Sequence, residues 1–145
     1  MLPLRGCLRL LGCAGVLAVA SCDSTGPHPS AGTYDLQTLN QAELPYDHEG
    51  LGCCVYLSGD LALTAGRYTV SLTFRNRNSG LVFTAMEWGK YLVHGAVLSF
   101  SADSSAVAPL GLDEGVLSGN GIAVSFGGEG HGSPDQFHGF FVLRE

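Results

Sequence analysis

Basic residues, long apolar runs and helical periodicity are all scarce in this sequence. Only seven of the 145 residues are Lys or Arg, and the five that lie beyond residue 21 are scattered. They form no stripe that could follow a phosphate backbone, so we expect no nucleic-acid partner. No run reaches the roughly eighteen apolar residues that a transmembrane helix needs. No window long enough to matter has the apolar spacing of a helix.

Motifs for catalysis and metal binding are missing as well. There is no Gly-x-Ser-x-Gly elbow, and the Gly-rich stretch 126–136 lacks the Lys-Ser/Thr pair of a phosphate-binding loop. The histidines show none of the short spacings typical of metal ligands; they are His28, His48, His94, His131 and His138. We expect neither an enzyme nor a bound metal or other cofactor.

The chain begins with the features of a secretion signal. Arg5 and Arg9 precede an apolar run, Leu10 to Ala20. As a helix this run would rise only about 16 Å, about half the hydrocarbon thickness of a bilayer. Removal of residues 1–21 changes the net charge from −6 to −8, because it takes away two basic residues and no acidic one. The mature protein is therefore expected to be acidic.

The junction Val19-Ala20-Ser21-Cys22 resembles the lipobox of bacterial lipoproteins, where a cysteine is diacylated and becomes the new N-terminus. The resemblance implies a signal peptide at 1–21 and a lipidated Cys22 followed by a flexible linker, together 22–30. It also implies a membrane anchor in the bacterial cell envelope, on its periplasmic or surface face. Two or three acyl chains anchor a protein stably without a spanning helix. The alternative is a soluble secreted protein cleaved near Ala20, with Cys22 incidental.

From residue 31 onward the dominant period is two. The clearest strand places four apolar side chains on one face: Tyr68, Val70, Leu72 and Phe74. Ala65-Gly66, just before it, has the character of a hairpin turn. The segments 89–100 and 115–126 repeat one pattern, a strand, a Gly-containing turn and a second strand ending in Ser-Phe. The pattern predicts an all-β, up-and-down antiparallel meander of about eight to nine short strands.

The order of these segments is similar to that of the lipocalin-like domains found on small bacterial lipoproteins. It runs from "GTYDLQTLNQAELP" through "LSGDLALTAGRYTVSLTF" and "GKYLVHGAVLSF" to "GVLSGNGIAVSF" and a closing strand. The resemblance covers residues 31–145 and implies a small barrel or half-barrel whose interior can hold a small apolar ligand. The bulky candidates for that interior are Tyr68, Val70, Leu72, Phe74, Tyr91, Val93, Leu98, Phe100, Val124 and Phe126.

Two functions from different classes follow from this interpretation. The first is a lipid-anchored envelope protein that binds a small apolar ligand in its barrel. The alternative is a structural or protein-interaction module of the envelope that carries no small-molecule ligand.

Cys53 and Cys54 are the cysteines that remain once residues 1–21 are removed and Cys22 is lipidated. Adjacent strand residues point to opposite faces, so a bond between the two requires a departure from strand geometry. Two thiols, a vicinal disulfide and an intermolecular bridge all stay open, as does a role as small core residues.

Overall fold

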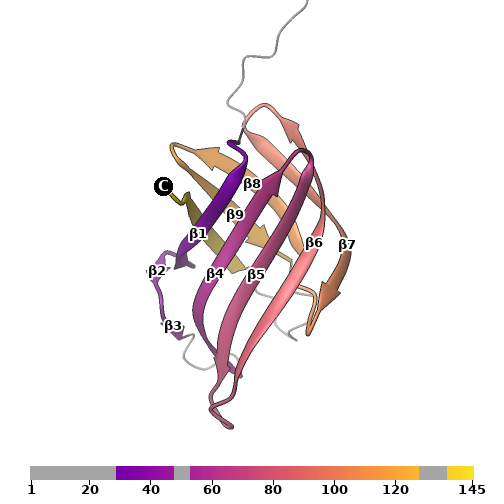
Figure 1. Ribbon diagram of the computed structural model, residues 1–145. Helices are drawn as coiled ribbons and strands as arrows, with labels where there is room; N and C mark the ends of the chain where they lie inside the picture. The colour runs from indigo at the N-terminus through magenta and orange to yellow at the C-terminus, as the bar shows by residue number, and fades with distance from the viewer. Residues whose placement is uncertain (1–28, 48–52, 128–136) are drawn as a thin grey trace, which may run out of the picture.

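The computed structural model describes residues 29–47, 53–127 and 137–145, and this part of the chain is all β (Figure 1). Its ten strands are β1 (Gly32–Leu39), β2 (Ala42–Glu43), β3 (Tyr46–Asp47), β4 (Cys54–Thr64), β5 (Arg67–Asn76), β6 (Val82–His94), β7 (Val97–Ala106), β8 (Leu112–Ser118), β9 (Gly121–Phe126) and β10 (Phe137–Leu143). Within these ranges no helix has the length and apolar character needed to cross a membrane.

Eight of the described strands close into an antiparallel barrel (Figure 1). Strands β4 to β10 each pair with the next along the chain, and β1 lies between β10 and β4. Tyr34 of β1 marks the closure, since it pairs with Leu143 on one side and with Leu61 on the other. The short strands β2 and β3 add to β1 and β4. The predicted all-β, up-and-down meander is confirmed, and it forms a closed barrel.

An arginine lies across this closure. Asp35 of β1 and Asp60 of β4 are directly opposite each other, which alone would place two negative charges side by side. The guanidinium of Arg144, just after β10, binds both carboxylates, with its Nη2 2.7 Å from Oδ1 of Asp60. The hydrogen bond from Arg144 holds the pKa of Asp35 below its usual value. The three strands that meet at the closure are thus joined by charge as well as by backbone pairing.

Glycine is required at two kinds of position in the barrel. Gly66 has a φ of +71° in the β4–β5 turn, a conformation that side chains with a Cβ rarely adopt. Gly89 of β6 is needed for a different reason, because a Cβ there would overlap the carbonyl oxygen of Ser101 on β7. The close approach at Gly89 adjoins a bulge in the β6–β7 pairing, between Trp88 and Gly89.

Strand β6 begins earlier than the sequence predicts. The predicted strand starts at Gly89, whereas β6 starts at Val82, which pairs with Arg75 of β5. In the added part, Ala85 and Glu87 occupy inward positions opposite Leu72 and Val70 of β5. Because Glu87 interrupts the apolar alternation, the period-two pattern does not predict this part of the strand.

The barrel interior is packed with apolar side chains from all eight of its strands. Seven of the ten residues predicted for the interior are buried in this core: Tyr68, Val70, Leu72, Leu98, Phe100, Val124 and Phe126. The other three are half-buried and pack against it: Phe74, Tyr91 and Val93. Tyr68 and Phe100 meet edge to face across the interior, with ring centroids 5.0 Å apart.

The two ends of the barrel differ. Pro29 and Ser30 lie beside the β8–β9 turn, at the end that also carries the β4–β5 and β6–β7 hairpins (Figure 1). We call this the tether end, because the chain enters the barrel there. The opposite end carries the β5–β6 hairpin, the start of β4 at Cys54 and the start of β10 at Phe137.

Candidate functional site

Aromatic side chains gather at the end of the barrel opposite the tether end. They come from five strands and are Tyr46, Tyr56, Phe74, Phe83 and Phe137; we call this cluster the aromatic end. Tyr56 is its centre, with ring centroids 5.7 Å from Phe137, 6.2 Å from Phe74 and 6.4 Å from Tyr46. Phe83 extends the cluster across β6, 6.0 Å from Phe74.

The aromatic end is only partly covered by the described residues. Phe83 is 39% exposed, and its neighbours Leu81 and Val82 are more than half exposed. Among the described residues most other apolar side chains of the barrel are buried, so these three stand out as exposed apolar side chains. Exposed apolar side chains at the mouth of a barrel are a common feature of binding sites.

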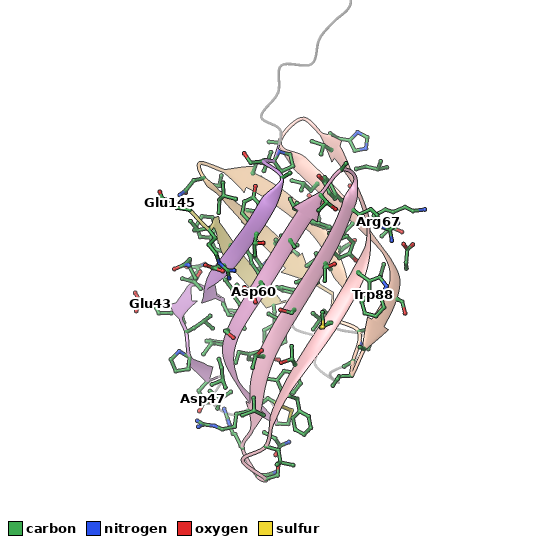
Figure 2. The ribbon with its side chains drawn as sticks, in the orientation of Figure 1. Glu43, Asp47, Asp60, Arg67, Trp88 and Glu145 are labelled. Carbon is green, nitrogen blue, oxygen red and sulfur yellow. A yellow bond between two sulfur atoms is a disulfide. The ribbon has the colours of Figure 1, made fainter. Side chains whose placement is uncertain are left out.

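Polar groups lie among these rings. Asn40 donates a hydrogen bond from Nδ2 to the hydroxyl of Tyr46, 3.3 Å away. Burial raises the pKa of Tyr56, and the nearby Tyr46 raises it further, so the Tyr56 hydroxyl stays neutral. Asp47 of β3 pairs with Arg77 of the β5–β6 hairpin at the same end (Figure 2). The aromatic end therefore combines exposed apolar side chains with the neutral hydroxyl of Tyr56.

A disulfide between Cys53 and Cys54 borders the aromatic end. The two Cα atoms are 3.7 Å apart, and the bond lies at the point where β4 begins, so only Cys54 belongs to the strand. Cys54 is buried and pairs with Asn76 of β5, while the carbonyl of Cys53 accepts a hydrogen bond from the backbone of Arg77. Of the alternatives left open by the sequence, the structure has the vicinal disulfide.

Glu87 is a buried carboxylate that the sequence analysis did not single out. It lies on the inner face of β6 and is 1% exposed. Oε1 accepts hydrogen bonds from the Tyr68 hydroxyl at 2.9 Å and from the backbone N–H of Leu112 at 3.1 Å. Oε2 accepts from the backbone N–H groups of Leu110 and Gly111, at 3.1 and 2.8 Å. Glu87 thus fixes the end of the β7–β8 connection and the first residue of β8, and the Leu110 and Leu112 side chains are buried in the core.

The hydroxyl of Tyr68 is held in its neutral form by this arrangement. Burial raises the pKa of Tyr68 above its ordinary value, and both the hydrogen bond to Glu87 and the Glu87 charge raise it further. Because the pKa is higher in the folded protein, the contribution of this group to stability is fully present below its unfolded pKa of about 10. The contribution is lost as the pH rises through the folded-state pKa.

Tyr68→Phe tests this arrangement through its pH dependence. Near pH 7 the variant should be less stable than the wild type by about 1.5–3 kcal/mol, the contribution of one hydrogen bond to a charged group. Above about pH 10 the difference in stability should shrink. The stabilisation linked to the raised pKa of Tyr68 is lost from the wild type as the pH rises, and the variant has no such contribution. Denaturant unfolding at a series of pH values measures the difference. A stability difference that stays constant to high pH would contradict the assigned role of Tyr68.

Strands β7 and β8 separate beyond a short stretch of pairing. Only Val97, Leu98 and Ser99 of β7 pair with β8, although β7 pairs with β6 as far as Ala106. A cleft of about 420 Å³ opens where the strands diverge. The described residues that line it are Glu87, Ala102, Pro109, Gly111, Leu112, Asp113 and Gly127.

The remaining sequence candidates are placed as follows. Trp88, considered for a ligand-contacting rim or a core position, is half-buried on the outer face of β6 (Figure 2). His138 approaches Oγ of Ser125 at 3.2 Å. Across 29–47, 53–127 and 137–145, no group of three His, Cys, Asp or Glu side chains is arranged to hold a metal ion. Cys22 and His131 lie outside the described residues.

Comparison with known proteins adds no relative. No protein-family model, no curated protein and no solved structure matches this chain.

Proposed function

We propose that this chain is a lipid-anchored protein of the bacterial cell envelope that binds a small apolar ligand at the aromatic end of its barrel. The observation that carries the proposal is the cluster of five aromatic rings there, with Phe83 partly exposed beside Leu81 and Val82. The mouths of β-barrels are common sites for small ligands. The residues support binding, and we propose no catalysis.

The packed interior favours the end of the barrel over its centre as the site. Val70 and Leu98 are 0% exposed and Tyr68 and Phe100 are in ring contact, so the middle of the barrel is filled by its own side chains. A ligand would contact the rings of Tyr56, Phe74 and Phe83, where apolar surface is available. The resemblance to lipocalin-like domains implies a ligand inside the barrel, whereas we propose a ligand at its end. The proposed class of ligand, a small apolar molecule, is the same in both cases.

The direction of the tether fits this arrangement. The lipid proposed at Cys22 precedes Pro29 by only seven positions, and Pro29 lies at the tether end. The aromatic end would then face away from the membrane, toward the aqueous side, where a ligand can reach it.

A neutral apolar dye tests the proposed ligand site. We would use the chain from residue 22 on, with Cys22→Ser so that no detergent is needed, and titrate it with N-phenyl-1-naphthylamine. The dye should become fluorescent with micromolar affinity, and Phe83→Ala should weaken its binding about tenfold, because stacking and burial against one ring contribute on the order of 1.4 kcal/mol.

Leu92→Ala is the matched control for this titration. Leu92 is also a large exposed apolar residue of β6, at 66% exposure, but it lies toward the tether end. Its replacement should leave dye binding unchanged. The proposal fails if the dye does not bind, or if the two variants weaken binding equally.

Lipidation at Cys22 has its own measurement. Mass spectrometry of the intact mature protein should show Cys22 as the N-terminal residue, bearing diacylglycerol. We expect this because the apolar run before Cys22 is too short to span a bilayer and ends in a sequence that resembles a lipobox. An unmodified N-terminus at any other residue would contradict the anchor.

A further inference from the structure

The outer half of β7 has a free edge in the described part of the barrel. All of residues 101–106 except Asp103 pair with β6 on one side, whereas β8 pairs only with Val97, Leu98 and Ser99. Alternate backbone N–H and C=O groups of residues 101–106 therefore point away from β6, on the side where β8 no longer pairs with β7, and Ala102 lines the cleft there. A free edge of this kind is a template for pairing with another strand.

The gap beside this edge is held open by Glu87. The carboxylate binds the backbone N–H groups of Leu110, Gly111 and Leu112, which draws this segment into the barrel and away from β7. Val107, at the start of the segment, has a φ of +71°, so the chain turns sharply as it leaves β7. The separation of β7 from β8 is thus built into the fold by specific contacts.

The edge lacks two of the features by which proteins block strand addition, Lys and Pro, but it has a bulge and a charge at Asp103. Residues 101–106 are Ser, Ala, Asp, Ser, Ser and Ala, with no Lys and no Pro. The one charged residue among them, Asp103, lies at a bulge in the pairing with β6 and is bound by Arg67 at 3.0 Å (Figure 2). The side chains along the edge are small, and all six residues are exposed.

The charge of the cleft indicates what would fit there. Its two ionisable lining residues are Glu87 and Asp113, and no Lys or Arg is among the described residues that line it. Asp113 is exposed, and the next residue, Glu114, is exposed too. A second copy of this acidic chain would bring like charges together at this place, whereas a strand with basic side chains would meet opposite charge.

We propose that the β7 edge binds an extended segment of a partner protein that carries Lys or Arg at alternating positions. The segment would add as a strand beside residues 101–106, with its backbone paired to β7 and its basic side chains near Asp113. Backbone pairing supplies affinity in this mode of recognition, and the side chains supply specificity. The proposal is independent of ligand binding at the aromatic end, which lies on other residues.

Peptide titration of the ¹⁵N-labelled full chain tests the proposal. The probe is acetyl-(Lys-Val)₃-amide, and the control peptide is acetyl-(Glu-Val)₃-amide. We expect saturable NMR shifts and slower hydrogen exchange at the backbone amides of residues 101–106 with the lysine peptide only. Asp113→Lys should weaken binding about tenfold, because it places like charges together.

Glu114→Lys is the matched control, since Glu114 is the adjacent exposed carboxylate but does not line the cleft. It should weaken binding less than about threefold, as expected of a rim charge. Unshifted amides at 101–106, equal binding of the glutamate peptide, or equal losses in the two variants would each overturn the proposal. Self-association of the chain through residues 101–106, seen by ultracentrifugation and the same amide shifts, would overturn it in favour of a second copy.

Discussion

Replacement of Glu87 by alanine is expected to lower the free energy of unfolding by about 3–5 kcal/mol. The carboxylate is 1% exposed and accepts four hydrogen bonds, from the hydroxyl of Tyr68 and from the backbone N–H groups of residues 110–112, where the chain enters β8. Alanine would leave these buried donors without their acceptor and would create a cavity between β6 and the inserted segment. Denaturant unfolding of the full chain measures the loss.

Two further variants separate the carboxylate from general effects of substitution. Glu87→Gln keeps the size of the side chain but directs an amide N–H₂ group at N–H donors, so it should also be strongly destabilising. Glu114→Ala, at an exposed glutamate of β8, should change stability by less than about 0.5 kcal/mol. If Glu87→Ala were as mild as Glu114→Ala, Glu87 would not hold the β7–β8 segment in place.

Phe141→Ala should cost about 3–5 kcal/mol of stability, whereas Phe83→Ala should cost about 1 kcal/mol. Phe141 is 0% exposed and packs against Phe126, with ring centroids 6.2 Å apart, so its removal leaves a cavity in a filled interior. Phe83 is 39% exposed at the aromatic end and can be removed with little loss of packing. Paired unfolding curves of the two variants give the comparison.

The comparison decides where a ligand can bind. A small cost for Phe141→Ala, below about 1 kcal/mol, would mean that the interior tolerates empty space and could itself hold a ligand. A cost for Phe83→Ala as large as that for Phe141→Ala would mean that the aromatic end is core and is not available for binding.

The sequence predicts the all-β meander because its strands follow the simplest rule of β structure. Tyr68, Val70 and Leu72 alternate with polar residues, and the structure places all three on the inner face of β5. Short Gly-containing turns join neighbouring segments, which favours pairing between strands that are consecutive in the chain. The closing of the barrel by β1 against β4 involves strands far apart in order, and only the resemblance to known barrels suggests it.

The role of Glu87 could not be predicted from the sequence. Both carboxylate oxygens of Glu87 accept hydrogen bonds from backbone N–H groups of residues 110–112. Because nearly every residue has a backbone N–H group, the sequence does not indicate which of them bind a side chain. One signal was available: from Ala85 to Val93, every second residue faces inward, and an acidic residue at an inward position implies buried partners. Because Glu87 interrupts the apolar alternation, the sequence also predicts a start for β6 that is later than the observed one.

The aromatic end was predicted only in part. Phe74 was expected in the interior and lies at its edge, but Tyr46, Tyr56, Phe83 and Phe137 come from four other strands, and only the closed barrel brings them together. The state of Cys53 and Cys54 also depended on the fold. It places Cys53 just outside β4, so the pair is free of the alternation that opposes a bond within a strand.

Native mass spectrometry of the protein as its own cells produce it, purified from their membrane fraction, tests the central claim most directly. The account predicts a lipidated protein that carries a small apolar molecule, and predicts that Phe83→Ala reduces the bound fraction while Leu92→Ala leaves it unchanged. A protein that carries no small molecule in its native envelope, and that binds no apolar probe with micromolar affinity, would contradict the account.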